Sequence, residues 1–404
     1  MARRARGAAP IPQTIDEITA EWCTKALADH SDGGTVTAVS AETIGTDIGF
    51  AGDVIRVHLT WDEPGPNRPR SVVVKVPATN PLNRSSAEAG GAYEREILVS
   101  RDMAHEMALP MPRHLYSEMT PNPLPWLEPA LIWLFDHLPM AALALLTRGA
   151  LWLSGHSRRR YVLVIEDIDD ARPPRQREGG TTEDVRAALE VLARFHAAHW
   201  MDQAVLDRNP WIMPLDAAPR LMQAAYRNNR EEFVERLGPV VHDATMQRID
   251  DVQERLPEIL NRLASGPWTL LHGDFRLDNV LVRADGSLVV LDFQLPRYGR
   301  AASDLAYFIT TAIDACDADA EEELLRLYHS TLETEGVTGY SYEEMVHDVR
   351  DVTWVLGHSM VTTAQFLDLS LAGDDASFGD ELSVRALGWL DAQVDDGEEL
   401  PRTA

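Results

Sequence analysis

The sequence has few cysteines and few basic residues for its length. Its 404 residues contain only Cys23 and Cys316, which lie far apart and lack the spacing of zinc ligands, so neither a disulfide framework nor a cysteine metal site is indicated. Lys and Arg total 37 against 64 Asp and Glu, a formal net charge of −27. Because phosphate backbones are bound by clustered Lys and Arg, this deficit argues against nucleic acid as a partner.

Long hydrophobic runs are also absent. No stretch approaches the ~18 apolar residues of a membrane-spanning helix, and the basic start MARRARGAAPIP lacks the apolar core of a signal peptide. We therefore expect a cytoplasmic protein without a transmembrane segment. The composition, 45% hydrophobic and 25% charged, is that of a globular protein. The length exceeds the ~100–200 residues of a usual single domain, which favours two packed units.

The first part of the chain has the pattern of a small sheet carrying one helix. Alternating β-branched and polar residues over 36–63 predict two strands joined by a glycine-containing loop. The apolar run SVVVKVP (71–77) predicts a strand buried on both faces. HLYSEM (114–119) and YVLVIEDI (161–168) predict two more strands.

The helix is expected to begin with Ser85 as N-cap and Glu88 in the capping-box position, and to run to about residue 106. On a helical wheel Glu96 falls within the apolar stripe, whereas Glu94 points away. Lys75 stands in the buried strand, where an unpaired charge is costly. We therefore expect Lys75 to pair with Glu96, with Glu94 and Glu88 as competing partners.

Between the last two strands, residues 120–160 form a hydrophobic insertion in which Asp136 and Arg148 interrupt the apolar runs. Each run is too short to cross a bilayer. We favour one or two helices that cover a hydrophobic cleft, while a peripheral membrane contact or a dimer contact stays open, as does the choice between monomer and homodimer. The charged loop ARPPRQREGG follows, and we predict an N-terminal lobe of residues 1–168 and a C-terminal lobe of residues 169–404.

The C-terminal lobe is mostly helical by pattern, and its first helix opens with Thr181 and Asp184 in capping positions. The exception is WTLLHGDFRLDNVLVRADGSLVVLDFQ, which predicts strand, loop, strand, Asp-Gly turn and strand. Asp274 and Asn279 sit five apart in the loop, and Asp292 ends the last strand. Three oxygen-bearing side chains can thus converge.

An amide oxygen and a carboxylate are ligands that Mg²⁺ accepts beside nucleotide phosphates, so Asn279 and Asp292 are the predicted magnesium ligands. Asp274 would then orient and deprotonate an attacking hydroxyl. The order of residues, Lys on a strand, Glu on the next helix, a D-x-x-x-x-N loop and a D-F dipeptide, is that of phosphoryl-transfer sites in kinases. In that scheme Lys75 binds the α- and β-phosphates and Glu96 holds it in place.

HGDFRLDN together with DFQLPRYGRAASDLAYF resembles the aminoglycoside phosphotransferase and choline kinase superfamily, and most closely its ecdysteroid-kinase-like (CHK kinase-like) branch. LARFHAAHW and YVLVIEDI are similar to the helix before the catalytic loop and to the hinge strand of these proteins. The resemblance covers roughly residues 40–115 and 160–310. It implies an α+β, bilobal protein-kinase-like fold, with a small N-terminal sheet lobe and a larger, mostly helical C-terminal lobe. It also implies ATP with Mg²⁺ and a small-molecule hydroxyl acceptor.

The resemblance suggests roles for further residues. His272 would support the catalytic loop by packing and hydrogen bonds, and Asp304 would cap the helix DLAYFITTA and orient the loop. The backbone of Glu166 and Ile168 would contact adenine, by analogy with the hinge. The nucleotide loop would be IGTDIGFAGD, whose glycines lack the spacing of a protein-kinase glycine loop: Gly45, Gly49 and Gly52.

The leading hypothesis is ATP-dependent phosphorylation of a hydroxyl on a small molecule. The tryptophan-rich insertion favours a lipophilic alcohol such as a sterol, whereas the acidic second half would suit a cationic acceptor such as an aminoglycoside. A resistance kinase for aminoglycosides or macrolides is thus an alternative, and so is a catalytically silent pseudokinase or ligand-binding protein. A protein kinase is disfavoured because Gln294 replaces the glycine of D-F-G and no A-P-E follows.

Overall fold

The computed structural model describes residues 9–44, 52–122, 128–155, 157, 159–174, 181–237, 241–313, 317–363 and 378–395. The chain divides into two compact units. The first comprises Met1–Pro125 and Ala150–Ala171, and the second Trp126–Gly149 and Arg172–Ala404. We expected the whole insertion to belong to the N-terminal lobe, but residues 126–149 group with the second unit.

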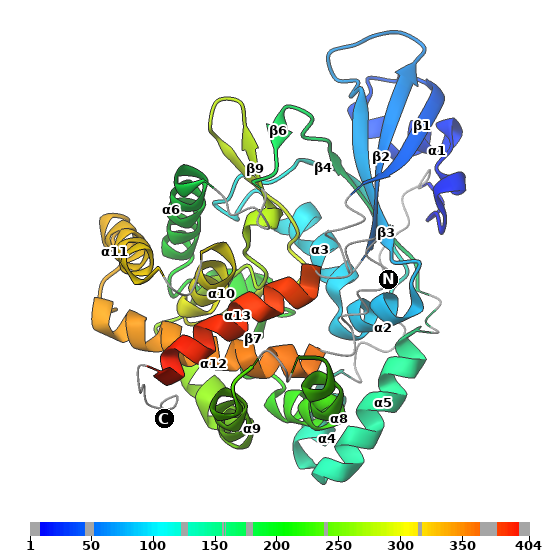
Figure 1. The fold of residues 1–404 in the computed structure, drawn as a ribbon. Helices are drawn as coiled ribbons and strands as arrows, with labels where there is room; N and C mark the ends of the chain where they lie inside the picture. The colour runs from blue at the N-terminus through cyan, green and yellow to red at the C-terminus, as the bar shows by residue number, and fades with distance from the viewer. Residues whose placement is uncertain are drawn as a thin grey trace. The chain divides into compact units, whose positions relative to one another are not determined.

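The first unit is built on a five-stranded antiparallel sheet with the strand order β1-β2-β3-β5-β4. Strands β1, β2 and β3 are labelled in Figure 1. All five predicted strands are present, two of them in the region 36–63. The strands are β1 (Val36–Ile44), β2 (Gly52–Trp61), β3 (Ser71–Pro77), β4 (His114–Met119) and β5 (Tyr161–Glu166). The short helices before the sheet are η1 (Ile15–Glu17), α1 (Ala20–Ala26) and η2 (Ala28–His30).

The alternation of side chains along β3 gives the sheet two buried faces. Val72 and Val74 pack in a core with Trp22 of α1. Val73 faces the other way, into a cluster with Tyr93 and Ile97. Since successive residues of a strand point to opposite faces, the side chain two positions after Val73 lies on the face covered by the second cluster. That side chain is Lys75.

The single helix predicted from Ser85 to about residue 106 is wrong in its start and its continuity. Helix α2 (Pro81–Gly90) begins four residues earlier, with the Asn80 side chain accepting the N–H of Asn83 at 3.3 Å. Gly91 follows at φ 69°, a left-handed conformation that breaks the helix. The chain then forms α3 (Ala92–Leu98) and a π-helical turn, η3 (Val99–Met103). Ser85 therefore lies inside α2 and is no cap.

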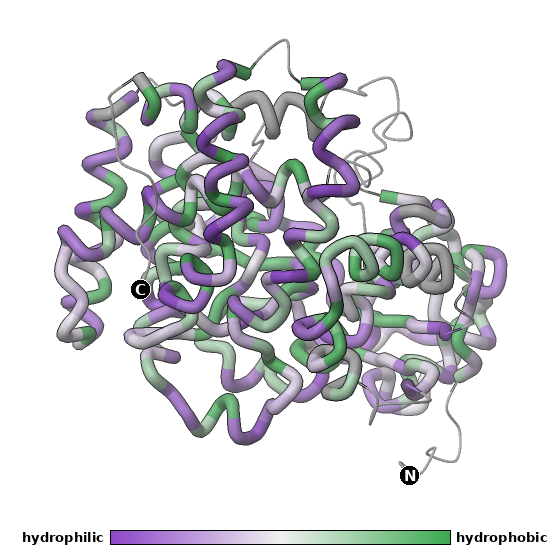
Figure 2. Tube along the Cα trace, turned by 90° about the horizontal axis from the view of Figure 1, so that it is seen from below, coloured by the Kyte–Doolittle hydropathy of each residue, from purple (hydrophilic) through white to green (hydrophobic). Residues whose placement is uncertain are grey.

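The second unit is mostly helical, and along its helices hydrophilic and hydrophobic residues alternate (Figure 2), as expected of helices with one buried face. Helix α12 (Tyr342–Thr363) packs against α8 (Pro219–Leu237), α9 (Asp243–Ala264), α10 (Ala302–Ala312), α11 (Ala318–Thr334) and α13 (Phe378–Asp395). Helix α6 (Thr182–Ala198) packs against α11, and the short α7 (Gln203–Arg208) follows α6 in the chain. Thr181 caps α6 as predicted, accepting the Asp184 N–H at 3.1 Å.

One or two helices were predicted for the insertion, and it forms two, α4 (Glu128–His137) and α5 (Met140–Gly155). Polar contacts hold them on α8. Arg220 donates to the Leu138 carbonyl at 2.6 Å and to that of Asp136, and Asn228 donates to the Ala144 carbonyl at 3.0 Å. Apolar side chains remain at the surface, with Trp133 61% and Leu145 72% exposed. Within the described residues, no helix combines the length and apolar character that crossing a membrane requires.

Short strands frame the segment around Asp274. The antiparallel hairpin predicted around the Asp-Gly turn is present as β9 (Val280–Arg283) and β10 (Leu288–Val290). A separate three-stranded sheet has the order β7-β11-β8. Its strands are β7 (Met213–Pro214), β8 (Thr269–Leu271) and β11 (Arg297–Gly299), while β6 (Ala171–Arg172) lies where the chain passes between the units.

Candidate active site

In the first unit, Lys75 and Glu96 form the expected ion pair. Lys75 Nζ lies 2.5 Å from Glu96 Oε1, and only 16% and 10% of the two side chains are exposed. The competing glutamates have other partners: Glu94 binds Arg159 at 2.7 Å, and Glu88 accepts from the Tyr161 hydroxyl at 3.0 Å. The pair forms because Lys75 lies on the face of β3 that α3 covers.

The other residues predicted for nucleotide binding lie in the first unit or outside the described residues. Gly52 opens β2 opposite Pro77, and a Cβ there would come within 2.8 Å of the Val76 carbonyl, so the close strand pairing requires glycine. Gly45 and Gly49 are not among the described residues.

The two residues predicted to form the hinge lie at and just beyond the end of β5. Glu166 is its last residue. Its N–H donates to the Arg113 carbonyl at 2.9 Å, and its carboxylate accepts the Arg113 N–H at 3.3 Å. Ile168 is buried.

In the second unit, Asp274 and Asn279 are hydrogen-bonded to each other. A short 3₁₀ helix, η7 (Leu277–Asn279), turns the chain back after β8. This turn lets Asn279 Nδ2 donate to both the carbonyl oxygen and the carboxylate of Asp274, at 2.8 and 3.0 Å. Asp292 follows β10 with a left-handed φ of 68°, and its charge acts on Asp274. Asp274 and Asn279 therefore meet in this loop, and Asp292 lies close enough for its charge to act on Asp274.

Burial raises the pKa of the Asp274 carboxyl, and the neighbouring charge of Asp292 raises it further. Arg276, His272 and the hydrogen bond from Asn279 act in the opposite direction. About a quarter of the Asp274 side chain, 24%, still faces solvent. A carboxylate that is destabilised but accessible is suited to accept a proton.

His272 and Asp304 brace this loop. His272 is fully buried, with Nε2 2.9 Å from the Leu291 carbonyl, and its Nδ1 accepts the Asp274 N–H at 3.2 Å. The Asp304 carboxylate accepts the N–H groups of His272 and Gly273, at 2.6 and 2.9 Å. The expectation that Asp304 caps a helix is wrong. Helix α10 begins earlier, at Ala302, and the carboxylate is occupied by the loop amides.

Two residues of this site, Arg276 and Tyr307, were not singled out from the sequence, and a third, His196, was interpreted only as a core position of its helix. His196 of α6, fully buried, lies 3.2 Å from the Asp304 carboxylate and 2.5 Å from the Tyr328 hydroxyl. Arg276 lies 3.5 Å from Asp274, and the Tyr307 hydroxyl also interacts with that carboxylate. Tyr307 could have been found, because it stands three residues after Asp304 and so shares its helix face.

The donor set fits a magnesium ion. The Asn279 side-chain nitrogen is engaged by Asp274, which leaves the amide oxygen as the atom available to a cation. Together with the Asp292 carboxylate it would offer two hard oxygen ligands, a number that suffices for Mg²⁺ when phosphates and waters complete the shell.

Solved structures similar to this chain include small-molecule kinases. A choline kinase from Cryptosporidium parvum Iowa II superposes with a TM-score of 0.53 at 12% identity, covering 89% of this chain and 91% of that one. An amicoumacin kinase, solved with AMP-PNP, Ca²⁺ and Ami, gives a TM-score of 0.48 at 12% identity and covers 90% of each chain. A macrolide 2′-phosphotransferase type I gives 0.46 at 15% identity, covering 94% and 98%.

The sheet-rich first unit, the larger helical second unit and the likeness to the choline kinase define the class: this is the kinase-like fold of small-molecule phosphotransferases, as predicted. The model of the ecdysteroid kinase-like family matches residues 48–337, well over half of the chain. The chain therefore belongs to the ecdysteroid kinase-like family. No curated protein matched it.

Proposed function

We propose that this protein transfers the γ-phosphate of ATP to a hydroxyl group of a small molecule, with Mg²⁺ as cofactor. The observation that carries the proposal is the hydrogen-bonded Asp274–Asn279 pair, with the charge of Asp292 close to it. Membership of the ecdysteroid kinase-like family supports it.

In the proposed reaction Asp274 orients the acceptor hydroxyl and takes its proton as the new oxygen–phosphorus bond forms. The bond from the γ-phosphorus to the bridging oxygen breaks, and ADP leaves. Asn279 and Asp292 would hold the magnesium ion, whose charge offsets that of the phosphates when it is bound. Lys75, fixed by Glu96, would bind the α- and β-phosphates. The hinge and glycine-loop residues complete the proposed nucleotide site.

For the acceptor we propose a lipophilic alcohol. We propose the cytoplasm as the location of the protein. Helices α4 and α5 keep large apolar side chains at the surface, among them Trp133, Leu134, Leu145 and Leu146, and the insertion has few charges. A cationic antibiotic is the competing acceptor, since the chain has a formal net charge of −27.

The test starts from a thermal-shift screen of alcohols and antibiotics in the presence of Mg²⁺ and AMP-PNP. With an acceptor in hand, we expect Asp274→Ala to abolish transfer while nucleotide affinity stays within about twofold. Asp285→Ala is the matched control, because this exposed aspartate lies in the nearby hairpin turn and binds only Ser287 among the described residues. Transfer by Asp274→Ala at the rate of the control would contradict the proposal. ATP binding without transfer to any acceptor would favour a pseudokinase.

A further inference from the structure

The catalytic loop (272–279) follows directly after β8, which pairs with β11 in antiparallel orientation. In β8 and β11, Leu271 pairs with Arg297 and Thr269 with Gly299. The chain leaving β8 continues directly into His272 and the catalytic loop, and β11 follows the segment that begins at Asp292. One end of the strand pair therefore leads to the proposed base and metal ligands. Arg300 stands immediately after the other end.

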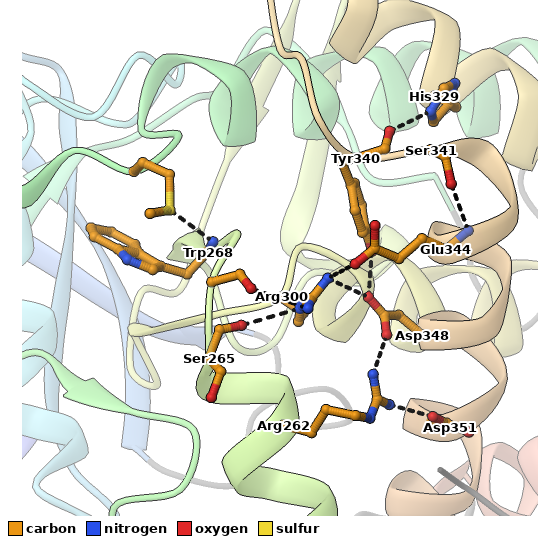
Figure 3. Close-up of polar contacts among 12 residues, drawn as sticks. Arg262, Ser265, Trp268, Arg300, His329, Tyr340, Ser341, Glu344, Asp348 and Asp351 are labelled. Carbon is orange, nitrogen blue, oxygen red and sulfur yellow. Dashed lines mark hydrogen bonds and ion pairs between the residues drawn. The ribbon is translucent and has the colours of Figure 1, made fainter. Parts of the chain in front are cut away.

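Arg300 joins the start of this strand pair to helix α12, as Figure 3 shows. Its Nε donates to the Ser265 carbonyl at 3.2 Å, and one terminal nitrogen, Nη2, donates to the Gly266 carbonyl at 3.1 Å. The other, Nη1, binds Glu344 at 2.5 Å and Asp348 at 3.3 Å. Arg300 is only 8% exposed. A single guanidinium thus holds the chain entering β8 on one side and two carboxylates of α12 on the other.

Asp348 is held firmly on its own side. It is 1% exposed and accepts from Arg262 at 2.6 Å and from the Tyr340 hydroxyl at 2.9 Å. Arg262 also binds Asp351 (Figure 3). Burial, together with the charge of Asp348, raises the pKa of Tyr340, so this phenol stays a hydrogen-bond donor. With these fixed partners, Asp348 gives Arg300 an anchor that cannot shift without leaving buried charges unpaired.

Arg300 also leads into the helix that braces the loop. Its N–H donates to the Leu263 carbonyl at 2.8 Å, and its own carbonyl accepts the Ser303 N–H at 3.0 Å. The next residue, Asp304, holds the amides of His272 and Gly273. A displacement of Arg300 would therefore shift the catalytic loop in two ways, by moving the chain that enters β8 and by moving Asp304 of α10.

We propose that Arg300, anchored by Asp348, is a positioning residue for the catalytic loop, keeping Asp274 and Asn279 in register for phosphoryl transfer. The role in transfer rests on the function proposed above. An ion network that only stabilised the fold would lose stability on any substitution, without a selective effect on the loop. The positioning role predicts that substituting Arg300 disturbs the catalytic loop, whereas substituting Arg262, the other arginine of the network, does not.

Arg262 supplies the matched control. Both arginines donate Nη1 to Asp348. The side-chain hydrogen bonds described for Arg262 go to carboxylates of α12, whereas the Arg300 side chain also donates to the Ser265 and Gly266 carbonyls. Lysine keeps the charge and loses the planar guanidinium. A lysine at position 300 can therefore bind either the carbonyls of Ser265 and Gly266 or the carboxylates of α12, but not both. The informative pair of variants is therefore Arg300→Lys and Arg262→Lys.

The first readout is amide hydrogen exchange of the full-length protein over residues 269–279. Arg300→Lys should speed exchange at His272 and Gly273 about tenfold, the factor that matches the net value of one hydrogen bond. Arg262→Lys should leave exchange there unchanged, because lysine keeps a positive charge opposite Asp348 and the Tyr340 hydroxyl still donates to that carboxylate. This readout needs no acceptor, so it tests the positioning role even if the proposed transfer fails. Equal exchange in the two variants would overturn the inference.

The second readout separates chemistry from nucleotide binding. In Arg300→Lys we expect kcat to fall about tenfold while the dissociation constant of Mg²⁺-AMP-PNP stays within about twofold. In Arg262→Lys the melting temperature should fall while kcat stays that of the parent. A loss of kcat in both variants, in proportion to lost stability, would refute positioning. If Arg300→Lys does not fold, Glu344→Gln is the second variant, since it weakens one contact of Arg300 at a side chain that is 40% exposed. It should speed exchange at His272 and Gly273 and lower kcat, each by less than is expected for Arg300→Lys.

Discussion

Replacing Asp304 by asparagine removes a buried carboxylate that accepts three hydrogen bonds. The partners are the N–H groups of His272 and Gly273 at 2.6 and 2.9 Å and the imidazole of His196 at 3.2 Å, and Asp304 is 2% exposed. Asparagine retains one acceptor oxygen and places an N–H₂ group where the second oxygen stood. Hydrogen bonds to a charged group contribute about 1.5–3 kcal/mol each. Even in the better orientation, asparagine loses the hydrogen bond from Gly273 and turns its N–H₂ group toward that donor, which should cost about 2–4 kcal/mol of unfolding free energy.

For a unit of this size, each kcal/mol lowers the melting temperature by about 2–4 °C, so we expect Asp304→Asn to lower it by roughly 4–16 °C. Circular dichroism at pH 7 measures the shift. Asp319→Asn, an exposed position in the first turn of α11, should shift it by less than about 2 °C. A shift for Asp304→Asn no larger than that of the control would refute the reasoning, because the carboxylate would then contribute nothing to holding the loop.

Three further outcomes are expected. Glu96→Gln leaves Lys75 without its carboxylate and should weaken Mg²⁺-ATP binding about tenfold by calorimetry; unchanged affinity would contradict the role of the pair. Burial lowers the pKa of His358 to about 3, so its contribution to stability should be complete above about pH 6.5 and be lost as pH falls toward 3; urea midpoints should show a weaker acid dependence in His358→Gln. Gly273→Ala places a Cβ 2.1 Å from a backbone oxygen and should abolish folding or activity, whereas Gly286→Ala, with a similar φ but open space, should cost about 1 kcal/mol.

Most of the predictions for the first unit rest on the alternation of side chains along its strands. Lys75 follows Val73 by two positions, so the pattern alone placed it on the helix-covered face, and the stripe of α3 separated Glu96 from Glu94. The break at Gly91 was not predicted, although a Gly-Gly pair stood in the expected helix. Propensity patterns assign a helix over the whole amphipathic stretch, whereas a left-handed glycine ends it locally.

In the second unit, the spacing of Asp274 and Asn279 predicted their proximity, because the two residues stand five apart in the eight-residue loop between β8 and β9, which leaves few ways to turn. The brace of Asp304 and His196 depends on three helices meeting, and no local pattern in one sequence reports such a contact. The network around Arg300 was missed for the same reason. Its carboxylates lie 44 and 48 residues away along the chain.

The placement of residues 126–149 in the second unit has a consequence for how the protein is made. The α4–α5 segment leaves the ribosome well before α8, the helix that carries Arg220 and Asn228, and at ~5–20 residues per second the wait is on the order of ten seconds. During synthesis its apolar side chains have no docking partner, which makes the segment a candidate for chaperone binding. A fragment that ends at residue 171 would carry the same liability. The first unit should therefore be prepared alone only with residues 126–149 replaced by a short polar linker.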